Sequence, residues 1–401
     1  MGLGKVTGKV ASMPMVTAPS RISRMRRQLL IGLGSAATLG HAATARATPL
    51  RFPQDFGAHP ERRIEWWYLT GWLADAAAPE VPVSGFQVTF FRSRTDVRPD
   101  HPSAFAARQL LMAHAAWSDL RSARQVHDQR IARAGFGLAG SATGDSDVHL
   151  RDWSLRREPV PGQRADQAST YRIALGRSAL GDRLDLQART TGPLLLQGED
   201  GWSRKGPQPT QASHYYSQPQ LAVQATRRHE GRTQALVGRG WLDHEWSDSL
   251  LDAEAIGWDW VGFNLADGRA LTAFRLRRHN RQGIGASPDD ATLWTGGSSR
   301  EPDGRSRSFR HGADEALRWT PLRHWTSPAT QARYPVEWQL DTPTGRYRVR
   351  ALFDAQELDS RASTGTVYWE GLSELLDADG RQRLGLGYLE MTGYAQPLTL
   401  R

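Results

Sequence analysis

Two acids and a histidine stand among tryptophans at residues 241–248, which read WLDHEWSD. If this segment is a strand, Asp243 and Glu245 share one face and His244 lies on the other. Two carboxylates on one face disfavour each other's ionisation, so one of them can stay protonated near neutral pH. A protonated carboxyl in an apolar setting is a proton donor, and the segment therefore indicates acid catalysis as one function to consider.

A third acid follows at Asp259, between Trp258 and Trp260. In a strand the two indoles share a face and the carboxyl points the other way, which is costly for a buried acid unless it is paired or functional. Acid catalysis that forms a cation needs a proton donor, a surface that tolerates positive charge, and a polar group that orients the attacking molecule. Indole faces attract cations, so acids beside tryptophans fit this chemistry.

Each of these groups also has a structural interpretation. Asp243 can pair with Arg239 across a hairpin, and His244 can be a hydrogen-bonded residue of a barrel wall. Glu65 begins the aromatic run EWWY, and an ion pair at the base of a barrel is the more usual role for such an acid. His114, in LMAHAAW, is expected to be a hydrogen-bonded core histidine rather than a catalytic one.

Several motifs can be rejected. The string HEWSD lacks the second histidine of a zinc-protease helix, and the 12 histidines are scattered without metal-ligand spacing. GFGLAG at 135–140 lacks a strand–helix context, so we expect a glycine-rich turn and not a dinucleotide site. The chain has no G-x-S-x-G motif, no phosphate-binding lysine loop and no cysteine. We therefore expect neither a metal nor a cofactor, and thiol chemistry is excluded.

The net charge of +9 is concentrated at the N-terminus. Residues 1–47 hold seven basic residues and no acid; subtracting them from 51 leaves 44 basic against 42 acidic residues, or +2, for the rest. A near-neutral remainder gives no electrostatic footprint for nucleic acid. We therefore expect no nucleic-acid partner.

The same N-terminal residues have the pattern of an export signal. A basic start and an apolar stretch precede Ala45 and Ala47, which form an A-x-A cleavage pattern. Arg26 and Arg27, followed by Gln-Leu-Leu, resemble a twin-arginine signal, with a Sec signal or an uncleaved anchor as the alternatives. No stretch of ~20 apolar residues follows, so we expect a periplasmic or secreted protein without a membrane span after the leader.

The sequence after residue 48 has the pattern of β-strands, and these strands must position the acids, histidines and tryptophans named above. Short aromatic or alternating runs occur at 64–73, 85–92, 109–120, 182–190 and 220–227. Hairpins are expected over 257–277 and 334–354, and the segments 365–372 and 384–394 are expected to pair. Many short strands predict an all-β sandwich or barrel, and the 15 tryptophans favour closed antiparallel barrels with a small cavity. A short helix is expected near 356–361 or 372–377.

These strands fit two barrels with a boundary near residue 250. The expected divisions are a leader at 1–47, an N-terminal barrel at 48–250 and a C-terminal barrel at 251–401. Glu370 and Glu390, in YWEG and YLEM, are expected to be paired inside the C-terminal barrel, with lining of a ligand cavity as the alternative.

Three segments together resemble one protein family. They are DFGAHPERRIEWWYLTGWL (55–73), GRGWLDHEWSDS (238–249) with GWDWVGFNLADGRALTAFRLR (257–277), and VYWEG with GYLEMTGY near the C-terminus. The chain is identified on these segments as similar to the AttH-like, carotenoid 1,2-hydratase-like group of lipocalin-related proteins. The resemblance implies two tandem lipocalin-like antiparallel β-barrels and export in Gram-negative bacteria, often beside an ABC export system.

The resemblance leaves two functions open. The first is an exported protein that binds an apolar small molecule or lipid in an aromatic barrel pocket, linked to ABC exporter components. The second is a cofactor-independent lyase, an alkene hydratase or cyclase acting on a polyene or isoprenoid. The hydratase pattern, in which a His/Trp element and an Asp carry the chemistry, implies Asp243, His244 and Asp259 as catalytic residues. The residues expected to line the ligand pocket are Trp246, Trp258, Trp260, Glu65, Trp67, Tyr68 and His114.

Overall fold

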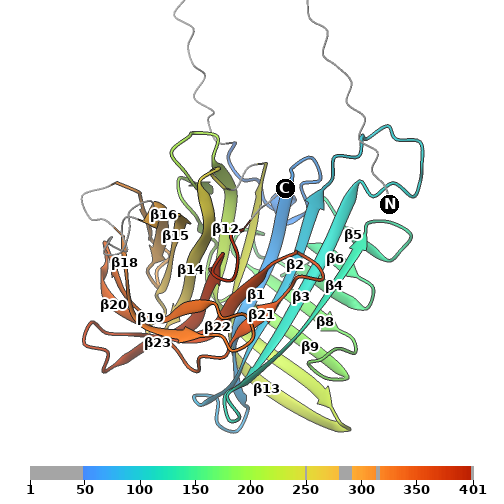
Figure 1. Cartoon of the computed structure of the whole chain (residues 1–401). Helices are drawn as coiled ribbons and strands as arrows, with labels where there is room; N and C mark the ends of the chain where they lie inside the picture. Colours follow the sequence, from blue (N-terminus) through green and yellow to red (C-terminus); the bar gives the residue numbers. More distant parts are fainter. Residues whose placement is uncertain (1–47, 249–250, 280–290, 313–316, 399–401) are drawn as a thin grey trace, which may run out of the picture. The chain divides into compact units, whose positions relative to one another are not determined.

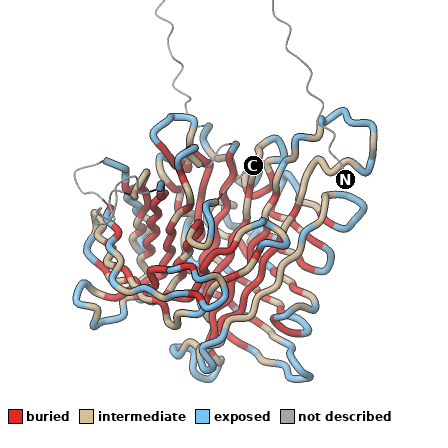
Figure 2. Tube along the Cα trace, viewed as in Figure 1, coloured by how far each residue is buried: buried red, intermediate tan, exposed pale blue. Residues whose placement is uncertain are grey.

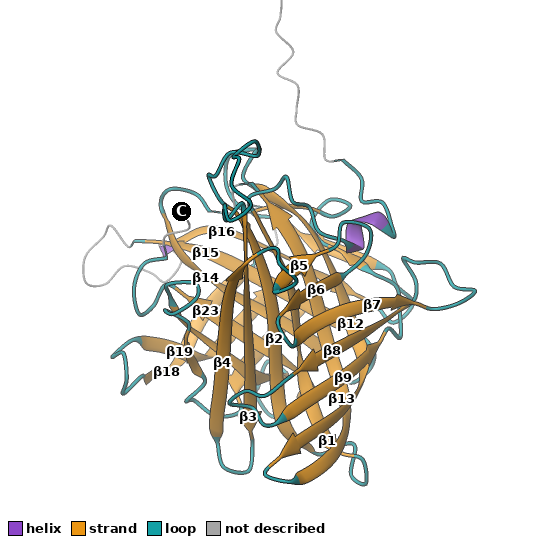
Figure 3. Cartoon of the chain, turned by 90° about the vertical axis from the view of Figure 1, so that its right-hand side faces the viewer, coloured by secondary structure: helices purple, strands orange, loops and turns teal. Residues whose placement is uncertain are grey.

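Strands make up nearly all of the regular structure in the computed structural model, which describes residues 48–248, 251–279, 291–312 and 317–398 (Figures 1 and 3). Within those ranges the helical structure is the 3-10 turn η1 (Gln54–Phe56) and the single residue Ala291. The expected export signal lies outside the described residues. None of the helices described could cross a membrane, because none is long and apolar enough.

The first sheet is a near-closed antiparallel barrel. It contains β1 (Ile64–Asp75), β2 (Pro82–Arg94), β3 (Gln109–Asp119), β4 (Arg124–Arg133), β5 (Ala139–Ser141), β6 (Asp147–Leu150), β7 (Trp153–Pro159), β8 (Ser169–Leu175), β9 (Arg183–Arg189), β10 (Leu195–Leu196), β11 (Trp202–Arg204), β12 (Ala212–His229) and β13 (Arg232–Ser247). The strand order is β4-β3-β2-β1-β13-β12-β9-β8-β7-β6-β5, with β10 and β11 also paired to β12. The barrel closes because β4, at one end of this order, contacts β6, near the other.

The second sheet is a half-barrel. It contains β14 (Ala255–Leu265), β15 (Ala270–Arg278), β16 (Thr292–Arg300), β17 (Ser306–Phe309), β18 (Arg318–Thr326), β19 (Arg333–Thr342), β20 (Gly345–Ala351), β21 (Glu357–Asp359), β22 (Val367–Leu376) and β23 (Arg383–Thr392). Its order is β17-β16-β15-β14-β23-β22-β20-β19-β18, with β21 paired to β22. The predicted all-β fold of two tandem barrels is confirmed, with the second barrel open.

The prediction of a short helix near 356–361 or 372–377 is wrong, because both segments overlap strands. Residues 357–359 form β21, and every residue of β22 is buried. β22 pairs with β20, β21 and β23, so its backbone groups are bonded on both sides. The leucines and glutamates of this segment favour a helix by only a few tenths of a kcal/mol each, roughly, and burial within the sheet outweighs that preference.

Alternation along β1 and β13 sends neighbouring side chains to opposite faces. Trp67 and Leu242 point into the core of the first barrel. Tyr68 and Trp241 point the other way, where they form a separate buried cluster with Trp260 of β14. Both faces of these two strands are therefore buried over much of their length, as the red segments of Figure 2 show.

We call this second region of burial the inter-sheet seam. It lies where β1, β2, β12 and β13 contact β14, β22 and β23. Its buried apolar members are Tyr68, Leu195, Trp241, Trp260, Ala270, Phe274, Leu372 and Tyr388. Gly85 of β2 permits close approach of the sheets, since a Cβ there would lie 2.7 Å from the hydroxyl oxygen of Tyr388 and 3.0 Å from Cβ of Leu372. The seam thus joins the two sheets through aromatic contacts.

Candidate functional site

The three residues expected to be catalytic do not converge. Asp243 faces the inter-sheet seam, whereas His244 beside it points into the first barrel, as strand alternation requires. Asp259 points into the core of the second sheet, where Arg275 and Arg277 hold its carboxylate. The titratable groups therefore form separate clusters, each of which has its own chemistry.

Asp259 has the contacts of a structural carboxylate. Its Oδ2 accepts a hydrogen bond from Nε of Arg275 at 2.7 Å and lies 3.2 Å from Nε of Arg277. Its Oδ1 accepts a hydrogen bond from the hydroxyl of Tyr394 at 2.9 Å. The guanidinium groups lie over the rings of Trp338 and Tyr394, 4.8 and 3.8 Å from the centroids. This arrangement favours the structural interpretation of Asp259.

Glu370 and Glu390 face the seam from the second sheet. They lie directly opposite each other on β22 and β23, and the next pair on the same face is Leu372 and Tyr388, both members of the seam. The indole N–H of Trp258 donates to Oε1 of Glu390 at 3.0 Å. The two acids face each other in the β22–β23 ladder, and the expected position inside the second barrel is wrong, because alternation along β22 and β23 turns them outward.

This pair holds protons near neutral pH. Burial raises the pKa of Glu390 to about 7; the N–H of Trp258 opposes this rise, and the charges of Asp243 and Glu245 add to it. Burial also raises the pKa of Glu370 well above its usual range, and the charge of Glu390 acts in the same direction. Two interacting carboxyls of this kind retain at least one proton at neutral pH. The pair therefore meets the main requirement of a general acid.

Half-buried aromatic side chains border the seam near these acids. Trp66 and Trp258 pack against the seam cluster and remain partly exposed, and Trp66 stands opposite Glu245 in the ladder between β1 and β13. Glu390 is also half-buried, whereas Glu370 is buried. The carboxyl of Glu390 thus lies at the edge of the seam, bonded by the indole N–H of Trp258.

Asp243 lines the opposite side of the seam. Its carboxylate accepts hydrogen bonds from the hydroxyls of Tyr215 at 2.8 Å and Ser217 at 2.5 Å, and from the indole of Trp241 at 2.7 Å. Burial raises its pKa to about 7 despite these three donors. The indole of Trp260 donates to the hydroxyl of Tyr215 at 3.2 Å, so a chain of hydrogen bonds runs from β14 to Asp243.

Glu245 has a cationic partner in the same region. Nζ of Lys205 lies 3.0 Å from its Oε1, and both side chains are buried. Lys205 is the only lysine in residues 48–401. Arg239, the alternative partner for Asp243, donates instead to Gln220 at 3.2 Å. The charge of Glu245 is therefore compensated, and Asp243 has only neutral donors.

Some buried polar atoms at the seam lack hydrogen-bond partners. Within the described ranges, Oε1 of Gln87 has no hydrogen-bond partner, and the hydroxyl of Tyr68 and Oε1 of Glu370 make no bond of good geometry, although each of these two side chains acts on the pKa of the other. Buried polar atoms of native proteins are nearly always hydrogen-bonded to the protein or to ordered water, and atoms of this kind also occur in the cores of both sheets. The seam thus combines apolar faces, proton donors and free polar atoms.

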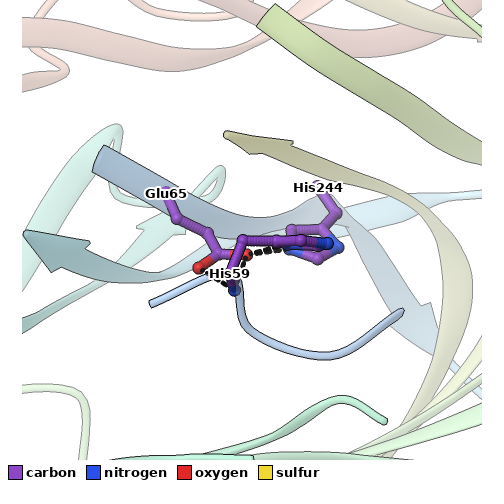
Figure 4. Close-up of side chains that lie close together, drawn as sticks. All are labelled: His59, Glu65 and His244. Carbon is purple, nitrogen blue, oxygen red and sulfur yellow. Dashed lines mark hydrogen bonds and ion pairs between the residues drawn. The ribbon is translucent and has the colours of Figure 1, made fainter. Parts of the chain in front are cut away.

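A second cluster of titratable groups lies inside the first barrel, on the other face of β13 (Figure 4). Oε1 of Glu65 is 2.9 Å from Nε2 of His244 and 2.8 Å from Nδ1 of His59, and Oε2 accepts a hydrogen bond from Nε of Arg92 at 2.7 Å. Although burial acts in the opposite direction, the hydrogen bonds from His244 and His59 and the charge of Arg92 hold the pKa of Glu65 well below its usual range. This acid is therefore a carboxylate, unlike Glu390.

The sequence separation of this cluster hides it from spacing arguments. His59 lies in the loop before β1, Glu65 near the start of β1, and His244 on β13, yet the ligand atoms of all three lie within 4.8 Å of one another. We expected no metal site because the histidines are scattered along the chain. The fold nevertheless gathers two imidazoles and a carboxylate that can hold a metal ion.

The residues expected to form one pocket are divided between the two faces of the first sheet. Tyr68, Trp258 and Trp260 lie at the seam, whereas Trp67 and Trp246 pack with Glu65 and His244 inside the barrel. The barrel interior is filled by a continuous core of buried side chains. The expected aromatic residues therefore serve two different places.

His114 joins the two sheets. Its Nδ1 lies 2.7 Å from the hydroxyl of Tyr368 and its Nε2 lies 2.7 Å from Oγ of Ser363. Burial lowers its pKa to about 3. With both ring nitrogens bonded and the ring neutral, His114 has the contacts expected of a hydrogen-bonded core histidine.

Sequence reasoning missed His59 and Lys205, and it placed Glu390 on the wrong side of its sheet. His59 stands in the polar segment AHPERR, which has no periodicity that could reveal its direction. Lys205 offered a signal in its rarity, because a lone lysine in an arginine-rich chain is unusual. The alternation around Glu390 showed which residues share its face, but not which sheet that face meets.

Comparisons with known proteins give the family of this fold. The sequence model described as AttH-like matches residues 43–394. A crystal structure of a protein described as an AttH from Nitrosomonas europaea is 42% identical, with a TM-score of 0.74, and the match covers 88% of this chain and 99% of that one. Kievitone hydratase from Nectria haematococca is 12% identical, with a TM-score of 0.61 and coverage of 87% and 94%, which shows a shared fold. No protein of curated function matches the sequence.

Proposed function

This chain belongs to the AttH-like family, and we propose that it is an acid-catalysed enzyme of the hydratase or cyclase type, acting on an unsaturated, largely apolar small molecule at the inter-sheet seam. The observation that carries the proposal is the half-buried carboxyl of Glu390, which is bonded by the indole N–H of Trp258 and whose pKa burial raises to about 7. The shared fold with a protein named a hydratase makes water addition the first reaction to test.

The proposed reaction balances without a redox group. The carboxyl of Glu390 transfers its proton to one alkene carbon, and the π electrons form the new C–H bond. The other carbon becomes a cation, which the faces of Trp66 and Trp258 stabilise. Water then bonds through its oxygen to the cation and gives a proton to the carboxylate, which restores the acid. In cyclisation a second double bond attacks the cation, and the proton lost from carbon returns to Glu390.

Two other acids support this role. Glu370, opposite Glu390, holds its own proton more tightly, because burial and the charge of Glu390 raise its pKa well above the usual range, while the charges of Asp243 and Glu245 disfavour the loss of the Glu390 proton. Asp243 lies across the seam with its pKa raised to about 7, so it is placed to exchange a proton with an oxygen of the ligand. Glu390 is thus the proposed catalytic residue.

Binding without turnover is the second candidate function. The half-buried indoles of Trp66 and Trp258 offer stacking surface to an apolar small molecule or lipid whether or not a proton moves. A link to ABC exporter components remains a prediction of the family resemblance. In that role the protein would pass its bound ligand to or from the exporter.

The test is turnover of a panel of polyenes, isoprenoids and unsaturated phenols in water labelled with oxygen-18, followed by mass spectrometry. Hydration adds one labelled water, cyclisation changes retention at constant mass, and binding alone quenches tryptophan fluorescence without a product. Glu390→Gln should abolish product formation while leaving fluorescence quenching within about twofold, because it keeps the shape and the acceptor for Trp258. Product formed by Glu390→Gln at the wild-type rate would refute the proposed acid.

We also propose export of the protein to the periplasm or beyond. The support is the twin-arginine-like pair Arg26 and Arg27 followed by small residues before Thr48. Replacing both arginines by lysine should retain the protein in the cytoplasm if the twin-arginine route is used, and leave export intact if the Sec route is used. Fractionation of cells that express the full chain distinguishes the two, and cytoplasmic wild-type protein would contradict export.

A further inference from the structure

We propose that His59, Glu65 and His244 form a binding site for one divalent transition metal ion, such as Zn²⁺ or Co²⁺, inside the first barrel (Figure 4). This site is separate from the proposed acid chemistry. His244 and Asp243 are neighbours on β13 and point to opposite faces of the strand, so the metal site and the seam lie on opposite sides of the sheet.

The three donor atoms converge as a metal requires. Nδ1 of His59 and Nε2 of His244 lie 2.8 and 2.9 Å from the same oxygen, Oε1 of Glu65. Ligand atoms at Zn²⁺–N and Zn²⁺–O distances of about 2.0–2.2 Å stand roughly 3.3 Å apart in a tetrahedron. All three donor atoms lie within 4.8 Å of one another, so the two imidazole nitrogens would have to approach each other by as much as about 1.5 Å when an ion binds. Two imidazoles and one carboxylate suit Zn²⁺, Co²⁺ or Fe²⁺ far better than Ca²⁺ or Mg²⁺.

Each proposed ligand has a partner that would orient it. The other nitrogen of His59, Nε2, lies 3.3 Å from Oδ1 of Asp55, which makes the carboxylate–histidine pair that commonly supports a metal ligand. The other nitrogen of His244, Nδ1, lies 3.0 Å from the hydroxyl of Tyr216. On metal binding each imidazole loses the proton that faces Glu65 and keeps an N–H toward its outer partner.

Glu65 keeps one oxygen for the metal. Its Oε2 is bonded by Nε of Arg92 at 2.7 Å and by the backbone N–H of His59 at 2.9 Å. Oε1 bonds only the two imidazoles and, more weakly, the same backbone N–H at 3.2 Å. The charge of Arg92 compensates that of Glu65, and Asp55 restores a negative charge beside the cation, so the site is not repulsive to a divalent ion.

Stacked rings fix the two histidines while leaving an entry route. Trp67 stacks on His244 at 4.6 Å between centroids, and Trp246 stacks on His59 at 3.8 Å. His214 covers the other face of Trp246 at 5.4 Å. His59 is half-buried in a loop, so an ion can approach from its side, whereas Glu65 and His244 are fully buried. Paramagnetic Co²⁺ bound here should quench the fluorescence of these two indoles.

The test uses the full-length protein without a histidine tag, stripped of metal and then incubated with one equivalent of Zn²⁺ or Co²⁺. After gel filtration, elemental analysis should find about one metal ion per chain, and Co²⁺ should give visible d–d absorption bands of a nitrogen- and oxygen-ligated site. His59→Gln should lose at least tenfold in Zn²⁺ affinity, and Asp55→Asn should lose about tenfold through weaker support of His59.

His214→Gln is the matched control, because His214 contacts Trp246 without belonging to the donor set. It should bind metal with wild-type affinity. His59→Gln is preferred to Glu65→Gln because His59 lies in a loop, whereas loss of the Glu65 charge leaves Arg92 buried and unpaired. A wild-type protein that holds no stoichiometric metal, or His59→Gln binding as tightly as wild type, would overturn the proposal.

Discussion

Replacement of Glu390 by glutamine should stabilise the protein, and the gain should grow with pH. Burial raises the folded-state pKa of Glu390 to about 7, from 4.5 for the free side chain. A raised folded pKa means that the contribution of this group to stability is fully present below pH 4.5 and is lost as pH rises through about 7. Glutamine does not titrate, so the variant does not incur this loss.

The magnitude follows from the size of the pKa change. A rise from 4.5 to about 7 corresponds to at most about 3.4 kcal/mol, at 1.36 kcal/mol per pKa unit. Because Glu390 is half-buried, solvent screening reduces this to about 2 kcal/mol. In a chain of this size a gain of about 2 kcal/mol corresponds to a Tm increase of about 3 °C.

The assay compares thermal and urea unfolding of wild type and Glu390→Gln at about pH 4.5 and about pH 8.5. The difference in unfolding free energy should be close to zero at the lower pH and about 2 kcal/mol at the higher one. Glu80→Gln, at an exposed glutamate in the turn after β1, controls for loss of a surface charge. If the stability difference between Glu390→Gln and wild type is the same at both pH values, Glu390 titrates normally and the acid assignment fails.

Three further predictions concern buried contacts within the two sheets and at the seam between them. Asp259→Asn should destabilise the fold by about 3–5 kcal/mol in urea unfolding, because it leaves two buried guanidinium groups without their carboxylate; a loss below about 1 kcal/mol would contradict the structural role. Gly262→Ala should lower the free energy of unfolding by about 1–3 kcal/mol, since the new Cβ would lie 2.4 Å from the indole of Trp260. An unchanged Tm would contradict tight packing at this point of the seam. Lys205→Met should lower the free energy of unfolding by about 3 kcal/mol, because it leaves Glu245 buried without a cation. Adding Glu245→Gln should restore most of that loss. If the effects of the two substitutions simply add in the double variant, the pairing is refuted.

Strand pattern and turn chemistry predicted much of the fold. The runs at 64–73, 85–92 and 109–120 became β1, β2 and β3, and the hairpin over 257–277 became β14 and β15. Period-two alternation is a local property, so it can be read without knowing the partners of a strand. The helix expected near 372–377 failed for the converse reason, since its leucines and glutamates fit a helix until both edges of β22 are paired.

The candidate sites were predicted only in part. Alternation correctly separated Asp243 and Glu245 from His244, because that follows from strand geometry alone. It did not show that the Asp243 face meets a second sheet while the His244 face meets a barrel core. For the same reason the acids Glu370 and Glu390 were assigned to the interior of the wrong layer.

The sequence alone determined the strand pattern, the two-barrel family and the faces on which the acids and indoles stand, because these depend on neighbours along the chain. Only the tertiary structure decided that His59, Glu65 and His244 meet, and that Glu390 faces the acids of the other sheet. Such encounters depend on which strands pair and which sheet faces pack, and residues far apart in sequence are then brought together. In WLDHEWSD, the fold places Asp243 and Glu245 on the seam side of β13 and His244 in the barrel.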